Sequence, residues 1–480
     1  MKRWRFGTAL AMVAMLASCG GGGGGGGNPG PPVAGPTPTP PPPPASSTCS
    51  LRSRQDWAAA QLREWYLFPE TLPASLNPAN YASVEDYIDA LTATARAQRK
   101  DRFFTYLTSI KEENAFYNSG SSAGFGVRFS YDTVQQRVFV SEAFEGAPAL
   151  AAGIDRGTEL LAIGTNAGNM RLVSEIMASG GAQAVSNALG PPDPGVTRVL
   201  RISNSAGTRE VSVTKADYEL TPVSSRYGAK IIDDNGRKAG YVNLRTFINT
   251  ADPALRSAFA NFKAAGVTEI IVDVRYNGGG LVSIAELIGD LMGANRASTD
   301  VFSFTTFRPE KSSNNSTRFF RPQPQSIAPT RVAFIGTTAS ASASEMIINA
   351  FIPYLGNREA LVGTNTYGKP VGQIAVDQAS CDDRLRVVAF KVENAARQGD
   401  YYDGLASKVE VSCRAGDDIT RQLGDPQEAS TRAALDFLAG RACTPIAAGG
   451  GITAQSVREQ RELLTPERPS VVQREAPGTF

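Results

Sequence analysis

The 480-residue sequence contains no histidine, and this absence excludes several kinds of chemistry. A Ser-His-Asp triad uses an imidazole as its base, so a serine nucleophile in this chain would need another proton acceptor. No CxxC spacing occurs among the five cysteines, and zinc sites usually combine such thiolates with histidine. These two features argue against a zinc site.

The chain also lacks an excess of charge of either sign. Lys and Arg number 48 and Asp and Glu number 46, with no basic block, so we expect no nucleic-acid partner. The hydrophobic content of 42% with 20% charged residues is typical of globular proteins with real cores. This length is enough for about three domains.

A long apolar run is missing as well. Three basic residues precede a short apolar run over residues 6–16, which is too short to span a bilayer and is typical of a secretory signal over residues 1–18. Its end, "LASC", resembles the bacterial lipobox and predicts lipidation of Cys19; the alternative is an ordinary signal peptide with a chance cysteine. Gly20 resembles the residue found in proteins sorted to the outer membrane. We expect a lipid-anchored protein of the bacterial outer membrane, facing the periplasm or exposed on the cell surface.

Residues 19–47 are rich in glycine and then in proline. The glycine run predicts a flexible coil, and residues 31–44 predict a polyproline II spacer reaching roughly 40 Å at about 3.1 Å per residue. This tether would hold a folded part clear of a membrane.

Four cysteines remain besides the lipobox cysteine, namely Cys49, Cys381, Cys413 and Cys443. An even number in an exported protein predicts two disulfides, with three possible pairings. We favour Cys381 with Cys413 and Cys49 with Cys443.

The rest of the chain divides into four segments that differ in the spacing of their apolar residues and in composition. Residues 48–118 show apolar spacings of three and four, which predict a small helical module. Residues 119–220 alternate as short strands do, and residues 221–445 combine apolar strands such as "VTEIIVDVRY" with amphipathic helices, as in a parallel sheet with crossover helices. Residues 446–480 are polar, with a glycine triplet and scattered prolines, which predicts a disordered tail.

The string "EGAPALAAGIDRGTELLAIG" resembles a PDZ domain, with a mild departure at the turn over residues 157–159. The resemblance places the carboxylate-binding loop at Gly124, Phe125, Gly126 and Val127. PDZ domains add an extended peptide as a strand and hold its terminal carboxylate on backbone N–H groups. The alternative is an unrelated small β domain.

The stretch "TTASASASEMIINAF", residues 337–351, follows an apolar strand and begins a helix. Ser342 with Glu345 fits a capping box, which is a purely structural role. The same strand-to-helix turn also suits a nucleophile, because helix N–H groups and the helix dipole favour negative charge there.

Without histidine, a lysine is the remaining common base for a serine. To accept a proton, a lysine must lower its pKa from about 10.4 by roughly three pH units, which requires burial or neighbouring charge. Lys369 in "TYGKPVGQIAV" lies among glycine and apolar residues with no charged neighbour in sequence. The alternative is a solvated turn lysine.

Three glycines, Gly278, Gly279 and Gly280, follow a predicted buried strand in "DVRYNGGG". The N–H of Gly279 or Gly280, paired with that of Ala343, would make an oxyanion hole. The alternatives are a plain tight turn and a phosphate-binding loop, but no P-loop Lys-Ser/Thr follows the glycines.

The ordered set "VDVRYNGGG", "TASASASE" and "YGKPVGQ", behind a PDZ-like segment, resembles the carboxy-terminal processing peptidases, or tail-specific proteases, over roughly residues 119–430. The resemblance implies Ser342, rather than Ser340 or Ser344, as the nucleophile. It implies Lys369 as the base and Gln373 as the residue that orients the lysine.

The same resemblance implies a crotonase- or ClpP-like α/β core and endoproteolysis near substrate C-termini without metal or cofactor. Two features depart from the family pattern: the serine and lysine are two residues further apart than expected, and Pro370 stands where a glycine is common.

Two hypotheses follow. The first is a membrane-tethered serine endopeptidase that acts on protein or peptide substrates recognised by their C-termini. The second is a non-catalytic peptide- or ligand-binding outer-membrane lipoprotein on the same fold.

Overall fold

The computed structural model describes residues 49–447 and 461–480. The predicted signal peptide, Cys19 and the tether therefore lie outside the described residues. No helix in the described part of the chain combines the length and the apolar character that crossing a membrane requires.

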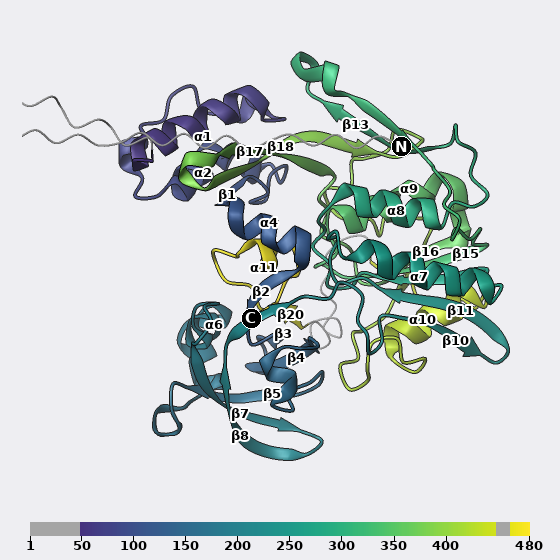
Figure 1. The fold of residues 1–480 in the computed structure, drawn as a ribbon, viewed down its shortest axis with the longest axis horizontal. Helices are drawn as coiled ribbons and strands as arrows, with labels where there is room; N and C mark the ends of the chain where they lie inside the picture. Colours follow the sequence, from purple (N-terminus) through teal and green to yellow (C-terminus); the bar gives the residue numbers. More distant parts are fainter. Residues whose placement is uncertain (1–48, 448–460) are drawn as a thin grey trace, which may run out of the picture. The chain divides into compact units, whose positions relative to one another are not determined.

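A six-stranded sheet forms the centre of the region predicted as α/β (Figure 1). Its order is β10 (Ala229–Asp234), β11 (Arg237–Asn243), β12 (Glu269–Asp273), β15 (Arg331–Gly336), β16 (Glu359–Gly363) and β19 (Val411–Arg414). The β10–β11 pair is antiparallel and the other four pairings are parallel. The prediction of a parallel sheet here is confirmed.

Helices cover both faces of this sheet. Helices α7 (Ala251–Ala264), α8 (Val282–Leu291) and α9 (Ala343–Leu355) lie on one face, and α10 (Ala429–Leu438) lies on the other (Figure 1). Successive side chains of a strand point to opposite faces. Accordingly, Ile270 and Val272 of β12 pack in the core with α7–α9, whereas Ile271 packs in the core with α10.

A five-stranded sheet joins the N-terminal segment to the same region. It contains β1 (Tyr106–Ser109), β13 (Val301–Phe307), β14 (Ser316–Phe319), β17 (Val371–Gln378) and β18 (Asp383–Glu393). The N-terminal helices are α1 (Leu51–Trp65), α2 (Val84–Leu91), α3 (Ala93–Ala97) and α4 (Ile110–Ser119). Leu62 and Ile88 of this segment share a core with Val387 of β18. The segment predicted as a helical module is therefore built into this sheet, through β1 and that shared core.

Residues 121–219 form a unit that we call the small β domain. Its strands are β2 (Ser121–Gly124), β3 (Val127–Asp132), β4 (Arg137–Ala143), β5 (Glu159–Gly164), β6 (Arg171–Leu172), β7 (Thr197–Asn204), β8 (Gly207–Thr214) and β9 (Ala216–Glu219). Its helices are α5 (Pro148–Ala151) and α6 (Val173–Leu189). The main sheet has the order β20-β3-β4-β5-β7-β8, and β20 (Glu462–Leu463) comes from the far end of the sequence.

The prediction of a disordered tail is wrong for residues 461–480, while residues 448–460 lie outside the described part. We call residues 461–480 the C-terminal segment. It contains β20 and helix α11 (Val471–Glu475), and its Leu464 and Phe480 join the core of the small β domain. The polar composition that predicts disorder is offset here by a groove that receives these few apolar side chains.

The favoured disulfide pairing is also wrong, because the structure pairs Cys49 with Cys381 and Cys413 with Cys443. Cys413 lies on β19, and Cys443 follows α10, which packs against the same sheet. Cys49 precedes α1, which packs near the turn between β17 and β18 where Cys381 lies. The Cα–Cα distances of 5.4 and 5.3 Å suit disulfide bonds.

Candidate active site

Ser342 lies at the turn between β15 and α9, immediately before the first residue of the helix. Its backbone has φ +55° and ψ −112°, a conformation that residues with a side chain rarely adopt. Strained backbone of this kind persists only where the surrounding structure enforces it, and it is common at active sites. The turn therefore holds the Ser342 side chain in an enforced position at the head of α9.

The other two serines of this stretch have structural roles. The Ser340 hydroxyl donates to the Val274 carbonyl at 2.6 Å, and the Ser344 hydroxyl donates to the Asn277 carbonyl at 2.9 Å. Both serines are buried, whereas Ser342 is half-buried. Ser342 is therefore the serine of the three that a substrate could approach.

The buried Glu345 carboxylate connects the serine turn to the lysine loop. One of its oxygens accepts the backbone N–H groups of Ser342 at 3.1 Å and Lys369 at 2.7 Å. The other oxygen accepts the Thr366 hydroxyl at 2.7 Å and the Gly368 N–H at 2.6 Å. Burial raises the pKa of Glu345, and these hydrogen bonds oppose that rise. The sequence signal for Glu345 was the capping box alone, which gave no hint of the lysine loop.

Lys369 lies next to Gln373, as the family resemblance predicts. Its Nζ donates to the Gln373 side-chain oxygen at 2.8 Å, and the Gln373 amide in turn donates to the Phe104 carbonyl. Burial is the main cause that lowers the pKa of Lys369. Among the described contacts there is no hydrogen bond between Lys369 Nζ and Ser342 Oγ. The two residues are linked through their backbone N–H groups, which share one Glu345 oxygen.

Arg102 supports the lysine loop from the N-terminal segment. Its guanidinium donates to the carbonyls of Tyr367 and Gly368 and lies 4.2 Å from the centre of the Tyr367 ring. Sequence reasoning missed Arg102, because 265 residues separate it from Tyr367 and no motif surrounds it.

The glycine turn packs directly against the serine turn. A side-chain carbon at Gly279 would lie 2.8 Å from Ser342 Cβ and 3.3 Å from the Ala343 nitrogen. Only glycine allows this approach, and φ is +121° at Gly279 and +130° at Gly280. Gly279 of the predicted glycines therefore lies against Ala343, whereas Gly280 lies against Phe247.

The hydrogen bonds of the turn distinguish its three N–H groups. The Gly279 N–H donates to the Asn277 side chain at 2.9 Å, and the Gly278 N–H donates to the Glu475 carbonyl at 2.9 Å. Within residues 49–447 and 461–480, no acceptor is recorded for the N–H groups of Gly280 and Ala343. Of the two glycines predicted for an oxyanion hole, Gly280 is thus the one with an available donor.

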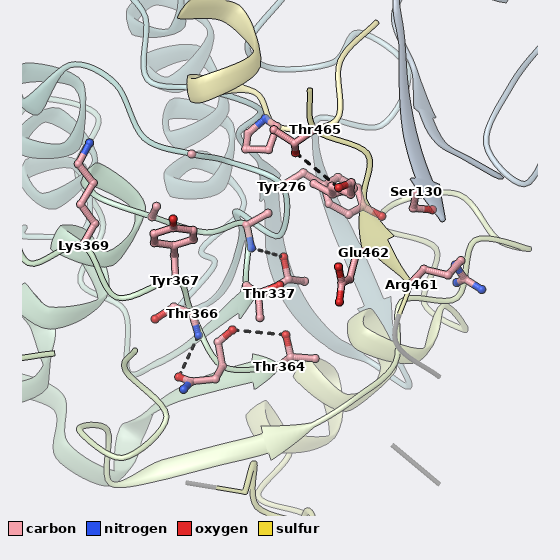
Figure 2. A pocket seen from close by; sticks show the side chains of 18 of the residues that line it. Ser130, Tyr276, Thr337, Thr364, Thr366, Tyr367, Lys369, Arg461, Glu462 and Thr465 are labelled. Carbon is pink, nitrogen blue, oxygen red and sulfur yellow. Dashed lines mark hydrogen bonds between the residues drawn. The ribbon is translucent and has the colours of Figure 1, made fainter. Parts of the chain in front are cut away.

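A cavity of about 1220 Å³ lies beside the lysine loop. Lys369, Gly278 and Ala341 line it, as do residues of the small β domain and of the C-terminal segment. Figure 2 shows Lys369 and Tyr367 toward one end of the pocket, and Ser130 and Arg461 toward the other. The cavity is large enough for several residues of an extended peptide, and it borders Lys369 and Ala341, the residue before Ser342.

The loop predicted to bind a carboxylate contacts the end of the C-terminal segment. The backbone N–H groups of Gly126 and Val127 donate to the Phe480 backbone oxygen at 2.9 and 3.4 Å. Gly124 lies against the same group, since a side-chain carbon there would lie 2.7 Å from the Phe480 carbonyl carbon. Phe125 is fully buried and contributes to the core of the domain.

No cluster of three or more cysteine, aspartate or glutamate side chains suited to a metal ion occurs in the described parts of the chain.

Two segments of this chain match models of known protein families. Residues 238–401 match the model of peptidase family S41, and residues 53–106 match the model of the peptidase S41 N-terminal domain. Two segments of the chain are thus similar to models of this family. The first match overlaps the serine turn, the glycine turn and the lysine loop.

Relatives with similar sequences are carboxyl-terminal processing peptidases. The chloroplastic carboxyl-terminal-processing peptidase 3 of Arabidopsis thaliana is 27% identical over 342 residues, which cover 68% of this chain and 61% of the relative. The carboxyl-terminal-processing protease of Synechocystis sp. is 23% identical over 390 residues, covering 79% of this chain and 82% of the relative. The chain spans between 54% and 61% of the length of three of its relatives.

The fold is similar to that of a solved S41 protease from Bacteroides fragilis, with a TM-score of 0.61 and 23% identity. The similarity covers 80% of this chain and 97% of that structure. The mixed α/β fold of this chain is thus shared with that structure.

Proposed function

We propose that this S41 chain is a serine endopeptidase that uses Ser342 as nucleophile and Lys369 as base. The observation that carries the proposal is the Glu345 carboxylate, because one oxygen accepts the backbone N–H groups of both residues. This bridge holds the strained serine turn and the lysine loop in one site, although 27 residues of sequence separate them.

The reaction begins when neutral Lys369 takes the proton of the Ser342 hydroxyl. The Ser342 oxygen then attacks the peptide carbonyl, and the N–H groups of Ala343 and Gly280 stabilise the resulting oxyanion. Lys369 returns the proton to the leaving amine, and a water activated by the same lysine hydrolyses the acyl-enzyme. Gln373 orients the amine throughout, which fits its 2.8 Å hydrogen bond to Nζ.

The small β domain would recognise substrates in the manner of a PDZ domain. Its loop of Gly124, Phe125, Gly126 and Val127 presents two N–H groups at the end of β3, where the Phe480 backbone oxygen lies. A substrate C-terminus would place its carboxylate on these groups and pair with β3 as an added strand.

The protein would act outside the cytoplasm. Two disulfides favour an oxidising compartment, and the lipobox-like sequence would anchor the chain through lipidated Cys19. We place it at the bacterial outer membrane, facing the periplasm or the cell surface.

Cleavage of an unfolded protein tests the proposal. Ser342→Ala and Lys369→Ala should each abolish cleavage without unfolding the chain, whereas Ser257→Ala, at an exposed position of α7, should leave it unchanged. A fluorophosphonate probe should label the parent at Ser342. Undiminished cleavage in either site variant would reject the assignment, and no labelling together with no cleavage would favour the non-catalytic lipoprotein.

A further inference from the structure

The C-terminal segment forms backbone hydrogen bonds with the same edge of β3 at two places. Glu462 and Leu463 of β20 pair antiparallel with Tyr131 and Ser130, and the Leu464 N–H continues this ladder to the Phe129 carbonyl at 2.9 Å. The chain then leaves β3 over residues 465–477.

Residues 478–480 return to the same edge one position further along. The Phe129 N–H donates to the Gly478 carbonyl at 2.8 Å, and the Phe480 N–H donates to the Val127 carbonyl at 2.9 Å. Thr479 forms an antiparallel bridge with Arg128. The two pieces together occupy the whole edge that an incoming peptide strand would need.

Residues 465–477, which connect these two pieces, cross the candidate active site. The Glu475 carbonyl accepts the N–H of Gly278, which belongs to the turn that faces Ser342. The Glu475 side chain accepts the Tyr117 hydroxyl at 3.0 Å, and Arg474 donates to the Phe103 carbonyl at 3.1 Å. Gln473, Arg474, Glu475 and Pro477 also line the cavity beside Lys369. One N–H of the glycine turn is therefore already bonded to this segment.

Phe480 fills the groove between β3 and α6. Its side chain is only 4% exposed, its ring centre lies 6.0 Å from that of Phe129, and it shares a core with Val185 and Leu189 of α6. The end of the segment thus combines an apolar anchor with the two N–H groups that hold its backbone oxygen.

We propose that residues 461–480 are an intramolecular ligand that occupies the peptide groove of the small β domain and covers the candidate active site. In this closed state a substrate has to displace the segment before it can pair with β3 and reach Ser342. A substrate able to do so would present the same features in extended form: a bulky apolar side chain, preceded by small residues, whose backbone oxygen reaches the N–H groups of Gly126 and Val127. The binding part of this inference stands alone, whereas the effect on cleavage rests on the proposed function.

The two charged side chains of the segment nearest Lys369 act on its pKa in opposite directions. Glu475 lies close enough to Lys369 to raise its pKa, against the lowering by burial, while Arg474 and Arg386 oppose Glu475. Removal of the segment would take Glu475 and Arg474 away from the lysine together. Occupation of the β3 edge and of the Gly278 N–H remains the principal block.

A peptide-binding experiment tests the inference without any need for catalysis. The full chain carrying Ser342→Ala is compared with the same chain carrying Phe480→Asp and with one lacking residues 461–480. The matched control is Phe319→Asp, which changes a phenylalanine that is 40% exposed on β14. The probe is a fluorescein-labelled synthetic peptide of residues 470–480 with a free terminal carboxylate, and its binding is followed by fluorescence anisotropy.

The full chain and the Phe319→Asp control should bind the probe at least about ten-fold more weakly than the chain lacking residues 461–480, because a tethered ligand competes at a high effective concentration. Phe480→Asp should increase the affinity toward that of the shortened chain. Equal affinity of the full and shortened chains would overturn the inference. If the shortened chain does not fold, Phe480→Asp decides alone, and binding no tighter than the parent would likewise overturn it.

A cleavage assay with Ser342 intact separates the two proposals. Phe480→Asp should cleave an unfolded protein about ten-fold faster than the parent, on the same argument of competition in cis. Tighter probe binding with an unchanged, measurable cleavage rate would overturn the closed state. Tighter probe binding with no cleavage by any variant would reject the proposed function and support the segment as an intramolecular ligand.

Discussion

A side-chain oxygen of Glu345 lies 2.7 Å from the backbone nitrogen of Lys369, 24 residues further along the chain. The same oxygen lies 3.1 Å from the backbone nitrogen of Ser342. The relative position of the serine and the lysine thus depends on one carboxylate that touches neither functional group.

Glu345→Gln should impair both stability and activity. The Glu345 carboxylate accepts four hydrogen bonds. A glutamine amide would point its own N–H groups at some of these donors and leave them unpaired. Each buried group left unpaired costs about 1–3 kcal/mol. We expect the free energy of unfolding in urea to fall by about 2–4 kcal/mol. The turnover number should fall by about 10²-fold as the site loosens.

The matched control is Glu310→Gln, because the side chain of Glu310 is 69% exposed. It should match the parent in both measurements. A Glu345→Gln protein that also matches the parent would show that the carboxylate does not set the geometry of the site.

Lys369 should give the cleavage rate a characteristic pH dependence. Only the neutral amine can accept the Ser342 proton, and burial lowers the pKa of Lys369. The rate should therefore rise with pH through a pKa below the ordinary lysine value of about 10.4. Initial rates across the pH range in which the parent stays folded measure this. A rate independent of pH throughout that range would argue against a lysine base.

The same lowered pKa predicts a stability cost in the folded chain. Between the pKa of folded Lys369 and about 10.4, the unfolded chain binds more protons, so the free energy of unfolding rises with pH in that window. Lys369→Met should be inactive yet more stable than the parent below the lowered pKa. The difference should shrink as pH rises toward about 10.4. The control Lys238→Met, at an exposed position, should show no such trend.

The disulfide pairing can be read directly by mass spectrometry of peptides digested without reduction. Peptides containing Cys49 and Cys381 should be linked, as should those containing Cys413 and Cys443. Replacing Cys413 and Cys443 by serine should lower the free energy of unfolding by about 2–5 kcal/mol. A Cys381–Cys413 link would contradict the structure.

The residues that the motifs predicted for the site lie in three short stretches. Ser342, Lys369 and the glycine turn each follow a strand of the parallel sheet, and carboxyl ends of parallel strands meet at one edge. What the motifs could not supply were bonds between stretches. The Gly278 N–H is taken by the Glu475 carbonyl, and Arg102 reaches the lysine loop from the N-terminal segment.

The fold predictions failed where distant segments meet. The pairing of four cysteines depends on how α1 and α10 pack against their sheets, which spacing alone does not reveal. Residues 461–480 have too few apolar side chains to order themselves, and their order comes from the edge of β3 and the pocket that receives Phe480. Composition describes a segment in isolation and carries no information about such a groove.

The backbone of Ser342 predicts an unusual order of stability among its variants. At φ +55° and ψ −112° a side chain is strained, at a cost on the order of 1–3 kcal/mol, whereas glycine adopts this conformation freely. Ser342→Gly should therefore be more stable toward urea than Ser342→Ala by about 1–3 kcal/mol, although both should be inactive. At Ser257, an exposed position inside α7, the order should reverse, and glycine should be less stable than alanine by about 1 kcal/mol. The same order at both positions would show that the turn imposes no strain, and the enforced placement of the nucleophile would lose its physical basis.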